Sequence, residues 1–160
     1  MGDAAPSLVV VCADVRDPGN AGTVLRSAAA AGADAVIACD GSVDLLNPKT
    51  VRASAGALFR VPIVNGGAPE AVLDALAAWG LTRLGTAAHG GTDYLEADLA
   101  APTALVLGNE AHGLRPEVAD RLDGAVTIPM AAGAESLNVG IAAAVLCFEA
   151  ARRRRVPAAG

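Results

Sequence analysis

The first forty residues constrain the fold more than any other part of the sequence. Residues 7–15 (SLVVVCADV) are an almost unbroken apolar run, which is typical of a strand buried on both faces of a parallel sheet. Residues 21–31 are rich in alanine and predict a helix, with Asn20 as its N-cap and Gly32 just beyond its end. Residues 34–40 (DAVIACD) predict a second buried strand. Parallel strands joined through a helix require a right-handed crossover, so we expect an α/β domain.

The remaining sequence continues this alternation of strands and helices. A small-residue helix (VRASAGALF) is expected next, and the chain becomes extended after Pro62. The other expected strands are 81–87, 104–107 and 125–128, and the other expected helices are 69–79, 116–122 and a long helix capped by Ser136 and ending near Arg152. Residues 88–101 are polar and contain glycine, which predicts a loop. Residues 1–160 are therefore expected to form a single α/β domain.

Composition narrows the class of protein. Apolar residues make up 53% of the chain, which is enough for a buried core. The net charge of −5 means that any contact with nucleic acid must use a local basic patch. No apolar run is long enough to cross a membrane. No Cys-x-x-Cys or Cys/His cluster indicates a metal site, and the separated cysteines predict buried free thiols in a reducing cytoplasm: Cys12, Cys39 and Cys147.

Three polar loops each follow an expected strand. They are DPGNAGTVLR at 17–26, GNEAHGL at 108–114 and GAESLNVG at 133–140. In open parallel sheets, ligands bind at the carboxyl ends of the strands, so these loops lie where a site is expected.

Each loop also has a purely structural explanation. Asn20 and Ser136 are good helix N-caps, and Glu110 is explained equally well as a solvated carboxylate. Arg26 lies six residues after Asn20, about 9 Å along the helix, so it either faces solvent or binds an anion. The pattern Gly-x-Gly-x-x-Gly is absent, which disfavours a dinucleotide-binding enzyme.

Taken together, the loops resemble the motifs of the SpoU (TrmH) family of RNA ribose 2′-O-methyltransferases, a branch of the SPOUT superfamily. The matching segments are DPGNAGTVLRSA, LVLGNEAHGL and IPMAAGAESLNVGIAAA, in that order. The segment VRASAGALFRVPI is similar to the segment that links the first two motifs in that family. The resemblance covers residues 8–151, which is nearly the whole chain.

This resemblance implies a fold and a cofactor. The fold would be a parallel sheet with helices on both faces and a C-terminal trefoil knot, over approximately residues 81–155. The cofactor would be S-adenosyl-methionine, and the protein would form a homodimer through the knot region and the C-terminal helix. The cofactor-binding residues implied by the motifs are Thr86, Ala87, Leu107, Gly108, Ile128, Met130, Ser136 and Leu137.

The implied activity is methyl transfer to a ribose 2′-hydroxyl of rRNA or tRNA. Arg26 matches the residue that the family places at this hydroxyl. Because arginine is effectively never deprotonated in proteins, we expect Arg26 to anchor the adjacent phosphate and stabilise the developing alkoxide, while another group accepts the proton. The catalytic residues that would position Arg26 and the ribose are Asn20, Glu110, Ser136 and Asn138.

Two basic segments are candidates for contact with RNA phosphates, and a solvated surface is the alternative for both. The first holds Lys49, Arg52 and Arg60, and the second is Arg152–Arg155. Many longer members of the family carry an N-terminal RNA-binding domain, which we expect to be absent here, so that the chain is either a minimal enzyme or a catalytic fragment. The alternative function is a non-catalytic RNA-binding or dimerisation module on the same fold.

Overall fold

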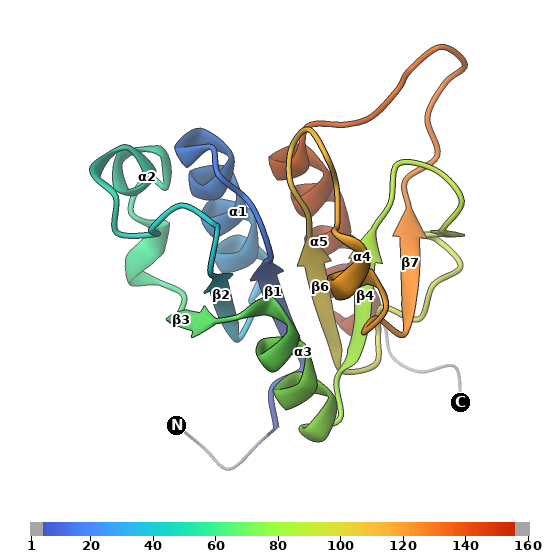
Figure 1. Ribbon diagram of the computed structural model, residues 1–160, viewed down its shortest axis with the longest axis horizontal. Coiled ribbons are helices and arrows are strands. Elements are labelled where there is room, and N and C mark those ends of the chain that lie inside the picture. The colour runs from blue at the N-terminus through green and yellow to red at the C-terminus, as the bar shows by residue number, and fades with distance from the viewer. Residues whose placement is uncertain (1–4, 156–160) are drawn as a thin grey trace.

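The computed structural model describes residues 5–155, and these contain one sheet of seven parallel strands (Figure 1). The strands follow the order β3-β2-β1-β6-β4-β7-β5 across the sheet. Their bounds are β1 Leu8–Cys12, β2 Ala35–Cys39, β3 Ile63–Gly67, β4 Thr82–Thr86, β5 Thr92–Asp93, β6 Thr103–Leu107 and β7 Gly124–Thr127. The expected parallel α/β sheet is confirmed. Strand β5 is a correction, because it lies within residues 88–101, which were expected to form a loop.

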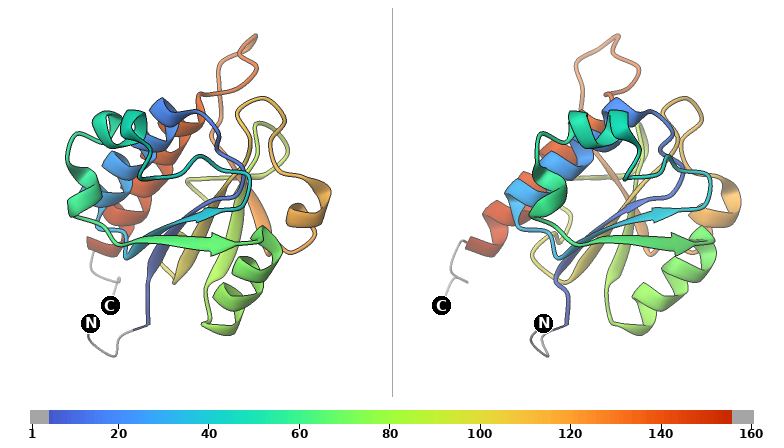
Figure 2. Two further views of the ribbon diagram at one scale, coloured as in Figure 1. Left: turned by 60° about the vertical axis from the view of Figure 1, so that its left-hand side comes forward. Right: turned by 90° about the vertical axis from the view of Figure 1, so that its left-hand side faces the viewer.

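Helices cover both faces of the sheet (Figure 2). Helices α1 (Pro18–Ala31) and α5 (Val139–Arg155) pack together on one face, while α3 (Pro69–Ala78) and α4 (Pro116–Ala119) lie on the other. Helix α2 (Pro48–Ala53) and the 3₁₀ helix η1 (Ala57–Phe59) both pack against α1. The expected small-residue helix is therefore divided in two. No helix among the described residues is long and apolar enough to cross a membrane.

The apolar run of β1 explains its place in the middle of the sheet. Val10 and Cys12 face the core under α1 and α5, while Val9 and Val11 face the core under α3, and all four are buried. Alternate side chains of a strand point to opposite faces, so a strand covered on both faces is apolar throughout. β1 pairs with β2 on one side and with β6 on the other.

Two helix N-caps differ from those expected. Asp17, not Asn20, caps α1, and its Oδ1 accepts hydrogen bonds from the amides of Gly19 and Asn20 at 2.8 and 3.1 Å. Pro18 then occupies the first helical position, where a missing N–H costs nothing. Asn138, not Ser136, caps α5 through hydrogen bonds from the amides of residues 140 and 141 at 2.9 and 3.2 Å. In both cases the expected residue lay within three positions of another good cap.

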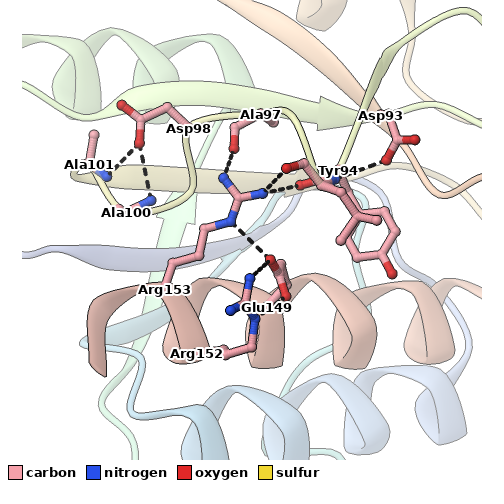
Figure 3. A network of polar contacts seen from close by, with 10 residues as sticks. Asp93, Tyr94, Ala97, Asp98, Ala100, Ala101, Glu149, Arg152 and Arg153 are labelled. Atoms are coloured by element: carbon pink, nitrogen blue, oxygen red, sulfur yellow. Dashed lines mark hydrogen bonds and ion pairs between the residues drawn. The ribbon is translucent and has the colours of Figure 1, made fainter. Parts of the chain in front are cut away.

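The arginines near the end of α5 bind the protein itself. Arg153 donates to the Glu149 carboxylate at 2.9 Å and to the carbonyl of Tyr94 at 3.0 Å, and it also contacts the carbonyls of Leu95 and Ala97 (Figure 3). Arg154 donates to the carbonyls of Ser7 and Ala101 at 2.6 and 2.9 Å. These two side chains tie α5 to the 93–101 segment and to the start of β1. Arg153 and Arg154 therefore stabilise the fold, whereas only RNA contact or a solvated surface was expected for residues 152–155.

Candidate functional site

A cavity of about 320 Å³ opens at the carboxyl ends of β4, β6 and β7, where it is closed on one side by α5. Its apolar wall comes from Ile128 and Met130 after β7, from Leu137, and from Val139, Ala142 and Leu146 of α5. Its polar wall comes from Thr86, Ser136 and the loop that follows β6. The size falls at the lower end of the range for small-molecule sites, and the lining suits a ligand with one apolar and one polar part.

The loop after β6 is rigid because it is bonded to itself. The Asn109 carboxamide oxygen accepts hydrogen bonds from the amides of Ala111 and His112 at 2.9 and 3.0 Å. Asn109 and Gly113 also exchange two backbone hydrogen bonds of 2.9 Å. Gly108 is buried where this loop folds back, and a Cβ there would lie 2.5 Å from the carbonyl carbon of Gly113. Only glycine fits, and Gly108 lines the cavity.

Glu110 connects this loop to the start of α1. Its Oε1 atom accepts hydrogen bonds from the amides of Arg16 and Asp17, both at 2.9 Å. The Asn109 carboxamide nitrogen also donates to the carbonyl of Asp14 at 3.3 Å. The Glu110 carboxylate, which was expected to be catalytic, therefore holds the first and second loops together. Glu110 also lines the cavity.

The first and third loops meet through two asparagines. The Asn138 carboxamide nitrogen donates to the Asn20 oxygen at 2.8 Å, while the Asn138 oxygen caps α5. Asn138 thus bonds the start of α5 to the first loop. The three sequence motifs, far apart in the chain, are connected by side-chain hydrogen bonds at one edge of the sheet.

Most of the residues expected to bind a cofactor line this cavity. They are Thr86, Ala87, Gly108, Ile128, Met130, Ser136 and Leu137. Leu107 is not in the lining, because its side chain is fully buried in the core under α1 and α5. Ser136 is exposed at the mouth of the cavity.

Arg26 stands apart from the other expected catalytic residues. It is exposed on α1, about 1.7 turns beyond Asn20, and it is absent from the cavity lining. Within residues 5–155, its side chain makes no ion pair. One chain therefore assembles the cavity but does not bring Arg26 to it.

The expected RNA-binding residues lie on one part of the surface. Lys49 and Arg52 are exposed on α2, and Arg60 is exposed directly after η1. Gly22 of α1 allows α2 to pack closely against α1. A Cβ at this position would lie 2.4 Å from the Cβ of Ala53, so only glycine permits this approach. Lys49, Arg52 and Arg60 therefore share the α1 side of the molecule with Arg26.

Sequence reasoning missed two residues of this edge. Asp17 caps α1 and Asn109 shapes the second loop, yet neither was a candidate. The signal for Asp17 was present, because an aspartate directly before a proline is a common helix start. Asn109 gave no such signal, since its role depends on how the loop folds back.

The three cysteine thiols take no part in the candidate site. Cys12, Cys39 and Cys147 are free and buried, as expected. Burial raises the pKa of each thiol to about 12, so they remain protonated and unreactive at neutral pH. Within the described part of the chain, no group of three or more His, Cys, Asp or Glu side chains could hold a metal ion.

Comparison of the sequence with protein families matches residues 7–148 to the SpoU rRNA Methylase family. Among curated relatives, the chain is 42% identical over 134 residues to the 23S rRNA (guanosine(2553)-2′-O)-methyltransferase RlmP of Bacillus subtilis, covering 84% of this chain and 54% of that protein. It is 39% identical over 142 residues to a 23S rRNA (uridine(2479)-2′-O)-methyltransferase of Streptomyces viridochromogenes, covering 86% and 50%. The chain thus spans about half the length of these relatives.

Solved structures show the same fold. The SpoU methyltransferase AviRb from Streptomyces viridochromogenes, in complex with the cofactor AdoMet, superposes with a TM-score of 0.84 at 37% identity, covering 95% of this chain and 62% of AviRb. A structure concerned with 2-OH methylation on tRNA superposes with a TM-score of 0.80 at 30% identity, covering 94% of this chain and 97% of that one.

Proposed function

The chain belongs to the SpoU rRNA methylase family, and on that premise we propose that it transfers a methyl group from S-adenosyl-methionine to a ribose 2′-hydroxyl of rRNA or tRNA. The observation that carries the proposal is the cavity at the carboxyl ends of β4, β6 and β7, which unites residues of the second and third motifs. Relatives with about 40% identity are named for this reaction on 23S rRNA.

The lining fits the cofactor. The apolar wall of Ile128, Met130 and Leu137 suits the adenine, and the lack of a side chain at Gly108 allows close approach of a flat ring. Glu110 and Ser136 offer polar groups at the mouth, where the amino-acid end of the cofactor would lie. When bound, the cofactor supplies an already activated methyl group on a sulfonium.

The chain then has to orient the ribose and assist loss of its proton. We assign Arg26 to the phosphate beside the reacting ribose, where a fixed guanidinium also stabilises the negative charge that develops on the 2′-oxygen. Asn20 and Asn138, bonded at 2.8 Å, would position the ribose from the other side. Glu110 would act by holding the start of α1 against the second loop.

A homodimer would complete this site. Ile141 and Phe148 of α5 are 52% and 47% exposed and lie seven residues, two helical turns, apart, so they form one apolar stripe. Helix α5 packs beside α1, which carries Arg26. Pairing two chains through this stripe would place Arg26 of one chain near the cavity of its partner, which explains why a single chain leaves the two apart.

We also propose the C-terminal trefoil knot. Its support is the strand order: β7 pairs with both β4 and β5, which precede it in the chain, while β6 takes the other side of β4. After β6, the chain therefore returns across the sheet and inserts β7 between β4 and β5, two strands that precede it in the sequence. A cytoplasmic location is part of the same proposal, since that is where rRNA and tRNA are modified.

Two measurements test the function. Titration calorimetry should detect binding of S-adenosyl-homocysteine and not of ATP or NAD. Labelled methyl groups should then pass to unmodified rRNA or tRNA and be recovered as 2′-O-methylnucleosides. Cofactor binding without transfer to either RNA would support the non-catalytic module instead, and binding of ATP or NAD alone would overturn the assignment.

An Arg26→Lys variant separates two roles for the arginine. If Arg26 positions the phosphate and ribose, lysine should lower kcat without introducing a new ionisation into the rate–pH profile. If Arg26 is the general base, lysine should preserve the rate and move the profile to the range where lysine titrates.

A further inference from the structure

Phe59 is the most exposed of the large apolar side chains that the structure describes. Its exposed fraction is 86%, against 62% for Trp79 and 60% for Leu46. Aromatic residues make up only 2% of the sequence, so the chain uses few such rings and presents this one almost entirely to solvent. The Phe59 ring contributes neither to the buried core nor to the lining of the cavity.

The ring stands on a rigid support. Ala55 has φ +51°, the one positive φ outside glycine among residues 5–155, and Gly56 follows with φ +85°. These two left-handed residues turn the chain sharply into η1, and Ala57 is buried against the core while Phe59 projects outward. A non-glycine residue in this conformation is strained, and such strain is commonly kept where a local geometry is needed.

Unpaired positive charge surrounds this support. Lys49, Arg52 and Arg60 are exposed within the twelve residues 49–60, which include Phe59. In the described part of the molecule none of them has an acidic partner within ion-pair distance. Six other arginines are paired with carboxylates. In a chain with a net charge of −5, free cations are therefore concentrated beside the exposed ring.

We propose that Phe59 is a stacking platform for an unpaired base of the RNA, with Lys49, Arg52 and Arg60 holding the flanking phosphates. Single-stranded RNA is bound in this way, by aromatic rings that stack on bases between cations that follow the backbone. The occupant is an RNA, because the unpaired cations complement its phosphates and the exposed ring complements an unpaired base. Stacking tolerates every base, so Phe59 contributes affinity for looped or single-stranded RNA rather than base identity.

This inference rests on the proposed function and names the form of RNA that the enzyme accepts. It predicts that substrate nucleotides near the target are unpaired. A blunt duplex offers no base face to Phe59, so it should bind through phosphates alone.

The test uses the full chain and its single tryptophan. Phe59→Ala is compared with Phe59→Tyr, which keeps a stacking ring, and with Trp79→Ala, which removes an exposed aromatic at the C-cap of α3, on the opposite face of the sheet. Binding is measured by fluorescence anisotropy with a short oligouridine and with a blunt RNA duplex of the same length. Phe59→Ala should weaken oligouridine binding by about 10-fold, as loss of one stacked base does, and leave duplex binding unchanged. Phe59→Tyr and Trp79→Ala should bind both as the parent does.

Stacking at position 59 can be observed directly by tryptophan fluorescence. In a Trp79→Phe background, Phe59→Trp places the chain's one indole at position 59, and stacking with oligouridine should quench its fluorescence. In the methylation assay, Phe59→Ala should raise the KM for RNA with little change in kcat, and calorimetry should show unchanged affinity for S-adenosyl-homocysteine.

Several outcomes overturn the inference. Equal loss of duplex and oligouridine binding, or no loss of either, excludes stacking. So does failure of the parent to bind oligouridine at all. Conversion of a dimeric parent to a monomer by Phe59→Ala in analytical ultracentrifugation assigns the ring to a protein interface instead. If the parent methylates RNA and the Phe59→Ala variant does so with the same KM, this inference fails while the proposed function stands. If the parent transfers no methyl group, the proposed function fails.

Discussion

The close approach of α1 and α2 at Gly22 gives a quantitative prediction about stability. A Gly22→Ala substitution would place a Cβ 2.4 Å from the Cβ of Ala53 and 2.7 Å from its carbonyl carbon. Ordinary contacts begin near 3.4 Å, so the helices must separate by about 1 Å at this point. Part of the obstruction is backbone, which cannot rotate away as a side chain could.

Two effects oppose one another in this variant. Alanine is a better helix former than glycine by about 1 kcal/mol, which favours the variant. Overpacking a close contact costs about 1–3 kcal/mol, and the backbone obstruction places this contact toward the upper end. We therefore expect a net loss of about 1–2 kcal/mol in the free energy of unfolding. For a chain of this length, Tm should fall by about 2–8 °C.

Urea unfolding followed by circular dichroism measures this change, with an unaltered slope showing that the variant unfolds from the same native state. Gly22→Ala combined with Ala53→Gly is the matched control. It removes the Cβ–Cβ contact but not the contact with the Ala53 backbone, so it should recover part of the loss beyond the sum of the single changes. A Gly22→Ala variant that is as stable as the parent, or more stable, would refute the tight contact and leave helix propensity as the whole effect.

Three further predictions concern other parts of the molecule. Gly108→Ala should weaken binding of S-adenosyl-homocysteine by 10-fold or more in calorimetry, because the new Cβ would lie 2.5 Å from the Gly113 backbone and displace the loop; unchanged affinity would mean that the loop does not shape the pocket. Hydrogen bonds from Arg152 and then Arg153 lower the pKa of Glu149 from 4.5 to about 2, so the pair stabilises the fold fully above pH 4.5 and ceases to do so as pH falls toward 2. Glu149→Gln should cost about 1–2 kcal/mol at pH 7, since water screens the exposed Arg152, and the difference should vanish in acid unfolding near pH 2; a difference that persists there would assign the loss to packing. The buried thiols should react with Ellman's reagent only after unfolding, and rapid reaction of the native protein would contradict their raised pKa values.

Most elements of this fold could be predicted from the sequence because they carry a local signal. The apolar run of residues 8–12 and the alanine-rich helices are visible as patterns, and Gly32 ends α1 in a left-handed conformation as expected. Strand β5 has only two residues, too few for any pattern. The helix starts were misplaced because Asp17 and Asn20, like Ser136 and Asn138, are pairs of suitable caps a few residues apart.

The site was less accessible to sequence reasoning, because it depends on strand order. The motifs indicated that the three loops act together, but only the placement of β6 beside both β1 and β4 brings Glu110 to the start of α1. The intramolecular role of Arg153 and Arg154 depended in the same way on where residues 93–101 lie. Charge alone could not distinguish an arginine that binds RNA from one that holds the fold together.

The position of β1 has a consequence for a chain made from its N-terminus onward. β1 leaves the ribosome before β6 and α5, yet Leu8 pairs with Thr103 of β6, and α1 is covered by α5. Until β6 and α5 have been synthesised, the central strand keeps one unpaired apolar edge and its helix keeps an uncovered face, both of which promote aggregation. A chain truncated before β6 would therefore be an aggregation-prone part of the sheet and not a smaller folded domain. We expect chaperones to bind the nascent chain until β6 and α5 have been synthesised.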